Sequence, residues 1–510
     1  MKAPNLFKRK KNEINFAHLR EMMNYYPQAE SMIDDVTWQD LTMDDIYVEM
    51  EETLTAQGDE ALYYSLHTPL FDPQALAARS AQISALNKDP LERENLRNDL
   101  KKTGRLRYDF RRSIQEDFQL STKERLMYLI GPLTTIALTV LMIATQAWNI
   151  GLFIFISIIF NGSLHFKFTK KYEAQIDTLS YTYKLLNFCA KYQKKDFFKS
   201  YSLAEPYAEI RKAHKDISFI FQLESLDFLA DYLNILFLIK ERRYVKVAKR
   251  LAPQANVLFQ LYEIVGQMDM HQGMSRFFAE NKKTICTPEL LANDQKTITF
   301  KELIHPLLKN PISNDLEIHS PLVITGSNMS GKSTFLRTIG VNVLLAQTWN
   351  FAYASEFSLC PLHIITSISL QDNLSEGKSY FLQEADAIRR MLEQSNRQHC
   401  TLFLIDEIFK GTNPVERIAS ATEICLALAN ANTLGLVATH DLQLIPQIPN
   451  YLPYYFTENV TKEDLSFDYK IHPGITTTRN AVKILEYLKY DPALIHKINQ
   501  RIAANEMLKN

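Results

Sequence analysis

The sequence has little of several features that mark other classes of protein. Only 14 of its 510 residues are glycine, which favours a well-packed, helix-rich protein. Its five cysteines are scattered without a C-x-x-C pair, so we expect neither a zinc site nor a disulfide framework, and a reducing compartment fits. Lysine and arginine (57) balance aspartate and glutamate (58), so no overall basicity points to nucleic acid. The basic N-terminus precedes no apolar core, so no signal peptide is predicted.

Charge is missing altogether between Arg125 and Lys167. Two apolar blocks, 126–144 and 148–166, lie in this stretch, and each is near the length of a helix that crosses a bilayer. Basic residues flank the pair, which places both ends on the cytoplasmic side by the positive-inside rule. We therefore predict a transmembrane hairpin within 121–170 that tethers a cytoplasmic ATPase domain to the inner membrane. The alternatives are a buried hairpin in a soluble domain and an interface between subunits.

The rest of the chain divides into helical and mixed regions, and its length suggests about three domains. Residues 1–120 and 171–295 carry charged and apolar positions mixed at helical spacing. From about residue 296 to 510, short strands and helices alternate, which is typical of a parallel α/β sheet. Candidate strands are 322–325, 401–405 and 434–438.

Residues 325–334 read TGSNMSGKST and contain Gly326-x-x-x-x-Gly331-Lys332-Ser333, the pattern of a phosphate-binding P-loop. An apolar strand precedes the loop and a helix follows it, which is the context that the motif requires. Backbone N–H groups of such a loop bind nucleotide phosphates. Lys332 should reach the β- and γ-phosphates, and Ser333 should hold Mg²⁺.

A second apolar strand, 401–405, ends at Asp406 and Glu407. Ligands sit at the carboxyl ends of strands in open α/β sheets, so we expect Asp406 to bind Mg²⁺ and Glu407 to polarise the attacking water. His440 follows a third strand, where it can sense the γ-phosphate. The sequence therefore predicts an ATPase with Glu407, Lys332 and His440 as its catalytic residues.

The segment 369–384 contains Ser375, Gly377 and Ser379 just before an amphipathic helix that starts at Tyr380. A helix N-terminus with small polar residues is a second anion site, which one nucleotide in one chain does not need. We interpret it as a segment that closes over the ATP of a dimer partner. An ordinary capped loop is the alternative.

These residues resemble a known family. TGSNMSGKST, DNLSEGKSYFLQE, LIDEIFKGTNP and Ala438-Thr439-His440 are similar to the motifs of MutS-type ATPases, the mismatch-repair branch of the ABC class. The segments 264–269, 305–308, 314–315 and 66–86 resemble further family elements, the last of them around Arg79. The resemblance is specific over about 255–475 and fainter over 30–100.

The resemblance implies a MutS-type P-loop NTPase domain at 296–510, preceded by a helical core and lever region that begins near residue 30. It implies a homodimer that binds ATP and Mg²⁺, with Ser333 and Asp406 as metal ligands. Ser379 would reach the partner's γ-phosphate, Tyr469 would lie against the adenine, and 411–413 would face the partner. The nucleotide loop would comprise Gly326, Ser327, Asn328, Met329, Ser330, Gly331, Lys332, Ser333 and Thr334.

The sequence also departs from the family. The Phe-x-Glu wedge of the mismatch reader is not found in its context, because 278–280 and 456–458 match only its letters. No appended nuclease domain is expected after the ATPase, and the hairpin at 126–166 is foreign to soluble mismatch readers. We therefore predict an ATP-hydrolysing protein that binds DNA in a repair-related role without the mismatch-recognition domain. The alternatives are a membrane-anchored mechanochemical ATPase with no DNA role, and a nucleotide-gated scaffold, which Glu407 disfavours.

Overall fold

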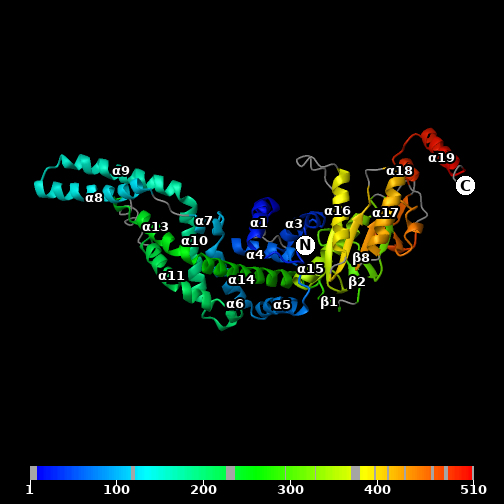
Figure 1. Ribbon diagram of the computed structural model, residues 1–510, viewed down its shortest axis with the longest axis horizontal. Helices are drawn as coiled ribbons and strands as arrows, with labels where there is room; N and C mark the ends of the chain where they lie inside the picture. Colours follow the sequence, from blue (N-terminus) through cyan, green and yellow to red (C-terminus); the bar gives the residue numbers. More distant parts are fainter. Residues whose placement is uncertain are drawn as a thin grey trace. The chain divides into compact units, whose positions relative to one another are not determined.

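The structure is a computed structural model that describes residues 9–116, 121–224, 236–292, 295–327, 329–368, 380–395, 398–409, 413–429, 432–460, 465–475 and 481–507. The chain forms two compact units. Figure 1 shows the chain coloured from its N-terminus (blue) to its C-terminus (red). Unit 1 comprises residues 1–51, 63–85 and 275–510, and unit 2 comprises residues 52–62 and 86–274.

A six-stranded sheet with the order β12-β9-β4-β8-β7-β6 forms the centre of unit 1. Its strands pair in parallel except β12, which is antiparallel to β9. All residues of β4, β6 and β8 are buried, as expected for a parallel sheet covered on both faces. The strands predicted at 322–325, 401–405 and 434–438 are confirmed as β4, β7 and β8. The strand bounds are β4 Leu322–Thr325, β6 Leu362–Ser367, β7 Cys400–Asp406, β8 Thr433–Ala438, β9 Leu452–Tyr455 and β12 His472–Pro473.

Two smaller sheets and several helices complete unit 1. The second sheet has the order β1-β5-β2-β3, and β10 and β11 form an antiparallel pair. Helices α15, α16 and α17 pack against the large sheet. The strands are β1 Glu289–Leu290, β2 Ile298–Leu303, β3 Asn314–Ile318, β5 Glu356–Leu359, β10 Glu458–Val460 and β11 Leu465–Phe467. The helices are α1 Phe16–Met22, α2 Asp35–Asp40, α3 Met43–Met50, α5 Pro73–Lys88, α15 Lys332–Trp349, α16 Tyr380–Gln394, α17 Pro414–Ala429, α18 Ala481–Tyr487 and α19 Pro492–Met507.

The N-terminal helices of unit 1 are fixed to the large sheet by a buried carboxylate. The Asp40 carboxylate accepts hydrogen bonds from the Thr366 hydroxyl (2.7 Å) and the Ile368 backbone N–H (2.8 Å) at the end of β6. Beside it, Leu41 fills the space above Gly340 of α15, where an added Cβ would lie 2.5 Å from the leucine side chain. The segment around residue 40 therefore belongs to the same core as the α/β sheet.

Unit 2 is helical in the part that the structure describes. Aromatic and aliphatic side chains from α6, α7, α10, α11, α13 and α14 form one continuous core. Its helices are α4 Ala56–His67, α6 Pro90–Thr103, α7 Phe110–Gln115, α8 Thr122–Thr145, α9 Ile150–Lys171, α10 Glu173–Tyr192, α11 Ala204–Glu224, α13 Ile239–Leu251 and α14 Ala255–Asn281, of which α4 and α14 also extend into unit 1.

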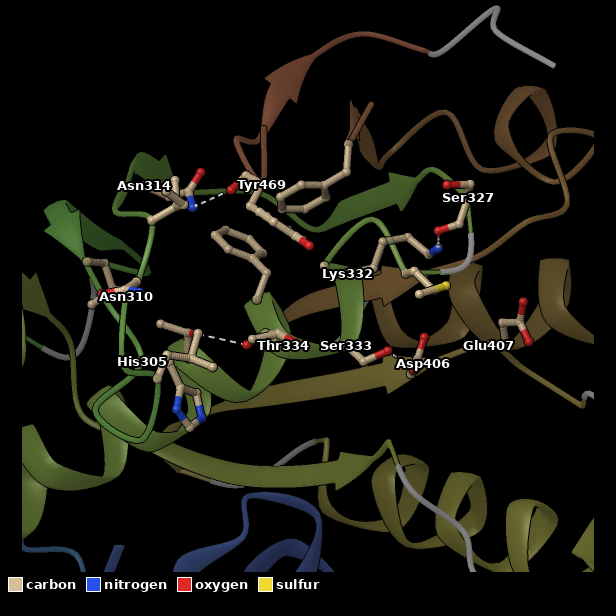
Figure 2. A pocket seen from close by; sticks show the side chains of 18 of the residues that line it. His305, Asn310, Asn314, Ser327, Lys332, Ser333, Thr334, Asp406, Glu407 and Tyr469 are labelled. Atoms are coloured by element: carbon tan, nitrogen blue, oxygen red, sulfur yellow. Dashed lines mark hydrogen bonds between the residues drawn. The ribbon is translucent and has the colours of Figure 1, made fainter. Parts of the chain in front are cut away.

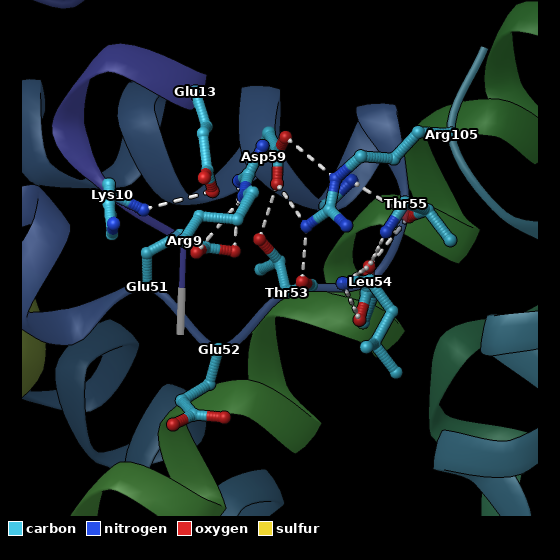
Figure 3. A network of polar contacts seen from close by, with 12 residues as sticks. Arg9, Lys10, Glu13, Glu51, Glu52, Thr53, Leu54, Thr55, Asp59 and Arg105 are labelled. Atoms are coloured by element: carbon cyan, nitrogen blue, oxygen red, sulfur yellow. Dashed lines mark hydrogen bonds and ion pairs between the residues drawn. The ribbon is translucent and has the colours of Figure 1, made fainter. Parts of the chain in front are cut away.

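A polar network starts helix α4 (Figure 3). The buried Asp269 carboxylate accepts from the backbone N–H of Leu54 (2.9 Å) and of Thr55 (2.8 Å), donors that have no partner inside the helix. Asp59 accepts from the Thr53 hydroxyl (2.5 Å) and pairs with Arg105 (3.3 Å). Burial raises the pKa of Asp269 to about 6, because the charged form loses its hydration.

Helices α8 and α9 form the expected hairpin and lie side by side (Figure 1, cyan). By length and composition both could cross a membrane, but a core helix of a soluble protein would meet the same criteria. A core helix would be mostly buried, whereas only 22% and 17% of their most apolar stretches are buried. Large exposed apolar residues include Leu133, Ile136, Val140, Ile143, Trp148, Leu152, Phe153, Phe155, Ile156, Ile159 and Phe166.

Three polar side chains of the hairpin, Thr135, Ser157 and Asn161, bond between its two helices. Thr135 donates to the Gly131 carbonyl (3.1 Å) and contacts the Ser157 hydroxyl (2.7 Å) across the pair. Asn161 is fully buried and donates to Thr135 (3.1 Å). Its Oδ1 lies over Gly131, where an added Cβ would come within 2.3 Å, so only glycine allows this approach. The hairpin is therefore polar inside and apolar outside.

Candidate active site

The predicted nucleotide loop joins β4 to α15 and has the backbone that its glycines allow. Gly326 has φ +147°, and an added Cβ would lie 2.8 Å from the Phe456 carbonyl oxygen. Gly331 has φ +105° and ends the loop one residue before α15 begins. Met329 also has a positive φ, +75°, and its side chain is exposed. The loop thus passes through conformations that other residues adopt only under strain.

Lys332 and Ser333 start α15 beside the end of β7. The Lys332 ammonium is buried and donates to the carbonyls of Gly326 (2.9 Å) and Ser327 (2.7 Å). The Ser333 hydroxyl donates to the Asp406 carboxylate at 2.5 Å. The sequence places these two residues 73 positions apart, and the structure brings them together because β7 pairs with β8 and β8 with β4.

Glu407 and His440 lie at the carboxyl ends of neighbouring strands. Glu407 has φ +65°, and its backbone N–H donates to the Ala438 carbonyl (2.9 Å). His440 Nε2 lies 3.2 Å from Glu407 Oε1. Burial, aided by the charge of Lys332, lowers the pKa of His440, which favours a neutral ring beside the Glu407 carboxylate. A paired Arg417 and Asp441 (2.8 Å) fix the loop that follows His440.

Tyr469 covers the other side of the loop. Its ring lies 3.1 Å from the position of a Cβ added to Gly331. Asn314 holds the backbone around it, because the amide donates to the Tyr469 carbonyl (3.0 Å) and accepts from the Ile471 N–H (2.9 Å). The Tyr469 ring therefore lies beside the nucleotide loop, and its predicted contact with adenine stays a prediction.

One cavity of about 630 Å³ connects these groups (Figure 2). Lys332, Ser333, Asp406 and Glu407 lie toward one part of it, and Tyr469, Asn314 and Asn310 toward another. Apolar side chains also line the cavity: Leu303, Leu308, Ile312, Phe335 and Phe456. The cavity thus combines a group of charged side chains with an apolar lining.

Most of the predicted site residues meet in this cavity. Its lining includes Ser327, Met329, Gly331, Lys332, Ser333, Thr334, Asp406, Glu407, His440 and Tyr469. Gly326 and Ser330 lie in the loop behind them, where the Ser330 hydroxyl donates to the Ser327 carbonyl (2.8 Å). Asn328, Ser379 and the segment 410–412 lie outside the described residues, so their predicted roles stay predictions.

The sequence alone assigned no role to two residues that line the cavity. Asn314 and His305 stood out only as family letters without a role, yet both line the cavity. Burial, aided by the charge of Arg337, lowers the pKa of His305 to about 4, so this ring is neutral. No local pattern marks them, because Asn314 meets Tyr469 across 155 positions of sequence.

Comparison with known proteins gives a consistent result. Residues 322–506 match the family model for MutS domain V. DNA mismatch repair protein MutS of Thermus thermophilus is 27% identical over 272 residues, 52% of this chain and 32% of that protein. MutS protein homolog 4 of Homo sapiens is 29% identical over 270 residues (49% and 28%), and Endonuclease MutS2 of Streptococcus agalactiae is 30% identical over 247 residues (46% and 30%).

The carboxyl-terminal part of the chain is therefore a mixed α/β domain of the MutS domain V type. The chain is a MutS-family protein, which confirms the resemblance. The match spans about a third of the length of these relatives.

Proposed function

We propose that the chain binds ATP with Mg²⁺ in the cavity beneath Tyr469 and hydrolyses it to drive a conformational change. One observation carries this proposal: Ser333 and Asp406, far apart in sequence, meet at 2.5 Å beside Lys332 and Glu407. Family membership supports it, because MutS-family proteins are ATPases.

The residues at the site fit both ligands. Ser333 and Asp406 offer hard oxygen ligands, which Mg²⁺ prefers, and Mg²⁺ commonly takes one or two protein ligands plus phosphate oxygens. The Ser327 hydroxyl is buried and has no hydrogen-bond partner among the described residues, so a phosphate oxygen would satisfy it. Bound Mg²⁺ would neutralise charge that develops on the phosphates.

The protein's own groups would then position the reaction. Lys332 would exchange its bonds to the Gly326 and Ser327 carbonyls for phosphate oxygens. Glu407 would accept a hydrogen bond from the attacking water, while His440, whose Nε2 lies 3.2 Å from Glu407 Oε1, would hold that carboxylate in place. Catalysis of this kind is mostly positioning and electrostatic stabilisation, which a cavity lined by fixed charges provides.

We further propose that two copies of the chain close over two nucleotides, with Ser379 of each copy reaching the other's γ-phosphate. Glu407→Gln should bind ATP without hydrolysing it and so accumulate the closed dimer. Size-exclusion chromatography of this variant with and without ATP tests the idea. A particle of monomer size in both conditions would exclude the dimer.

By resemblance, we propose a DNA-binding, repair-related role as the process that the ATPase drives. The relatives named for DNA mismatch repair support this role. ATP hydrolysis should then rise when mismatched, branched or plain duplex DNA is added, and DNA affinity should fall with salt. Hydrolysis that responds to none of these DNAs would exclude it.

The outward-facing apolar side chains of α8 and α9 favour a second candidate, a membrane-anchored ATPase with no DNA role. In either case we propose that the hairpin crosses the cytoplasmic membrane and leaves the ATPase domain in the cytoplasm. Thr135 and Asn161 donate hydrogen bonds to groups inside the protein, which lowers the cost of placing these donors at membrane depth. The full chain should sediment with membranes and resist extraction by alkaline carbonate. Release into the soluble fraction would exclude the anchor.

A further inference from the structure

The two helices of the hairpin carry their charges at one end. Lys123 and Arg125 lie on the first turn of α8 and Lys167, Lys170 and Lys171 on the last turns of α9, all exposed. Lys171 at the end of α9 pairs with Glu124 in the first turn of α8 (2.8 Å), so the basic residues of both helices lie at the same end of the hairpin. Glu124 is the only acidic residue from 121 to 172, and Glu173 follows at the start of α10, so five basic residues outnumber two acidic ones at this end of the hairpin.

A third helix, α13, begins beside this end of the hairpin. Asn161 of α9 donates to the Leu236 carbonyl (2.9 Å). Two residues later, Leu238 has a positive φ (+48°) and precedes the first residue of α13. His165 Nδ1 lies 2.5 Å from Glu241 Oε1 in the first turn of α13. These two contacts hold the amino end of α13 beside α9, within two residues of Lys167.

The sequence of α13 is IKERRYVKVAKRL, with six basic residues and one acid. That acid, Glu241, is buried and already pairs with His165. Lys246 and Lys249 are exposed, and Arg250 pairs with Asp216 of α11. Both exposed lysines lie in the second half of α13, so this helix carries exposed positive charge on from the hairpin and no exposed acid.

We propose that this surface binds the phosphate-bearing headgroups of anionic phospholipids. We call it the basic belt: Lys123, Arg125, Lys167, Lys170, Lys171, Lys246 and Lys249. The inference rests on the proposed membrane anchor and adds the kind of lipid that the anchor selects. Basic clusters next to a membrane-crossing helix attract anionic lipids, and each cation near the surface strengthens binding about fivefold.

The neighbouring surface favours lipid over nucleic acid as the partner. The belt directly adjoins the exposed apolar side chains that begin at Leu126 and end at Phe166. A DNA duplex could contact the basic residues but would leave those side chains in water. A bilayer with anionic headgroups covers both, because lysine and arginine stems reach from an apolar surface to the charged layer.

The test compares lipids around the full chain in proteoliposomes of phosphatidylcholine and phosphatidylglycerol. Electron spin resonance measures how strongly spin-labelled phosphatidylglycerol associates with the protein relative to spin-labelled phosphatidylcholine. We expect a preference of about fivefold or more for phosphatidylglycerol that weakens as salt rises. The variant Lys123→Gln/Arg125→Gln/Lys167→Gln/Lys170→Gln should lose most of it, and Lys246→Gln/Lys249→Gln part of it.

The matched control changes four other exposed lysines of unit 2 to glutamine: Lys101, Lys102, Lys184 and Lys194. It should keep the full preference. Equal loss in the control would overturn the inference, because net charge alone would then explain the effect. Displacement of the labelled phosphatidylglycerol by soluble duplex DNA would overturn it in favour of a nucleic-acid surface.

Vesicle flotation separates this inference from the anchor. Retention in vesicles of phosphatidylcholine alone, without any preference in mixed vesicles, would overturn the belt and leave the anchor standing. Failure to float with either vesicle would overturn both. Retention with a salt-sensitive preference that the belt variants lose supports both.

Discussion

The candidate nucleotide cavity and the helical hairpin place their polar groups in opposite ways. In the cavity, Lys332, Asp406 and Glu407 line an open space, and the apolar strands behind them are buried. In the hairpin, Thr135, Ser157 and Asn161 lie inside, and the apolar side chains face outward. Polar groups that line a cavity can bind a ligand from solution, whereas a large exposed apolar surface indicates contact with an apolar partner.

The most severe way to break the cavity is to remove its buried cation. Lys332→Ala should lower ATP turnover by roughly a hundredfold or more, because Lys332 is the only positively charged residue in the sequence of the loop, 325–334. A coupled assay of phosphate release measures this. Folding is checked by circular dichroism, and normal turnover in a folded variant would refute the site.

The corresponding change in the hairpin is a charge on its outer face. Ile136→Asp together with Phe155→Asp should move most of the protein from the membrane fraction to the soluble or aggregated fraction, because each charge costs about 2.5–3.5 kcal/mol at membrane depth. Fractionation followed by immunoblotting measures the distribution.

The matched control is Leu91→Asp, at an exposed apolar residue of α6 outside the hairpin. It should leave the distribution unchanged. If the hairpin variant fractionates like this control, the hairpin does not face lipid.

Asp269 is a buried polar group that belongs to neither the cavity nor the hairpin. Its pKa is raised from 3.8 to about 6 in the folded protein. Between these values the folded state holds more protons than the unfolded state. Protonated Asp269 therefore contributes about 3 kcal/mol to the free energy of unfolding below pH 4. This contribution is lost as pH rises to 6.

Asp269→Asn removes this titration while keeping the side chain's size. From pH 4 to pH 6.5, the thermal unfolding midpoint of the wild type should fall relative to that of the variant. Differential scanning calorimetry in detergent at several pH values measures it. A difference that stays constant with pH would show that Asp269 does not titrate in this range.

The smallest expected effect lies on the apolar side of the cavity. Asn314→Ala removes two hydrogen bonds that hold the backbone around Tyr469. Freed from them, Tyr469 should stack less well on a base, and KM for ATP should rise about fivefold. The phosphate side is untouched, so kcat should stay near the wild-type value. A fall in kcat with unchanged KM would place Asn314 in another role.

The same contrast explains what could be predicted from the sequence. Lys332 and Ser333 lie in one local motif, and Asp406 ends an apolar strand, so the phosphate side followed from short patterns. The helices at 126–144 and 148–166 followed from length and missing charge, but their crossing of a membrane remains a proposal.

Contacts between distant positions could not be predicted in this way. Asp40 meets Thr366 across 326 positions, and Asn161 meets Leu236 across 75. Each is a single polar residue that no periodicity distinguishes from a solvated one, since its meaning depends on the fold around it.

Isothermal titration calorimetry of the wild-type chain with ATP, in the presence and absence of Mg²⁺, tests the central claim most directly. The account predicts saturable binding below millimolar ATP that weakens when Mg²⁺ is removed or when Asp406 is changed to Asn. No binding at millimolar ATP with Mg²⁺, by a chain that is folded, would contradict it.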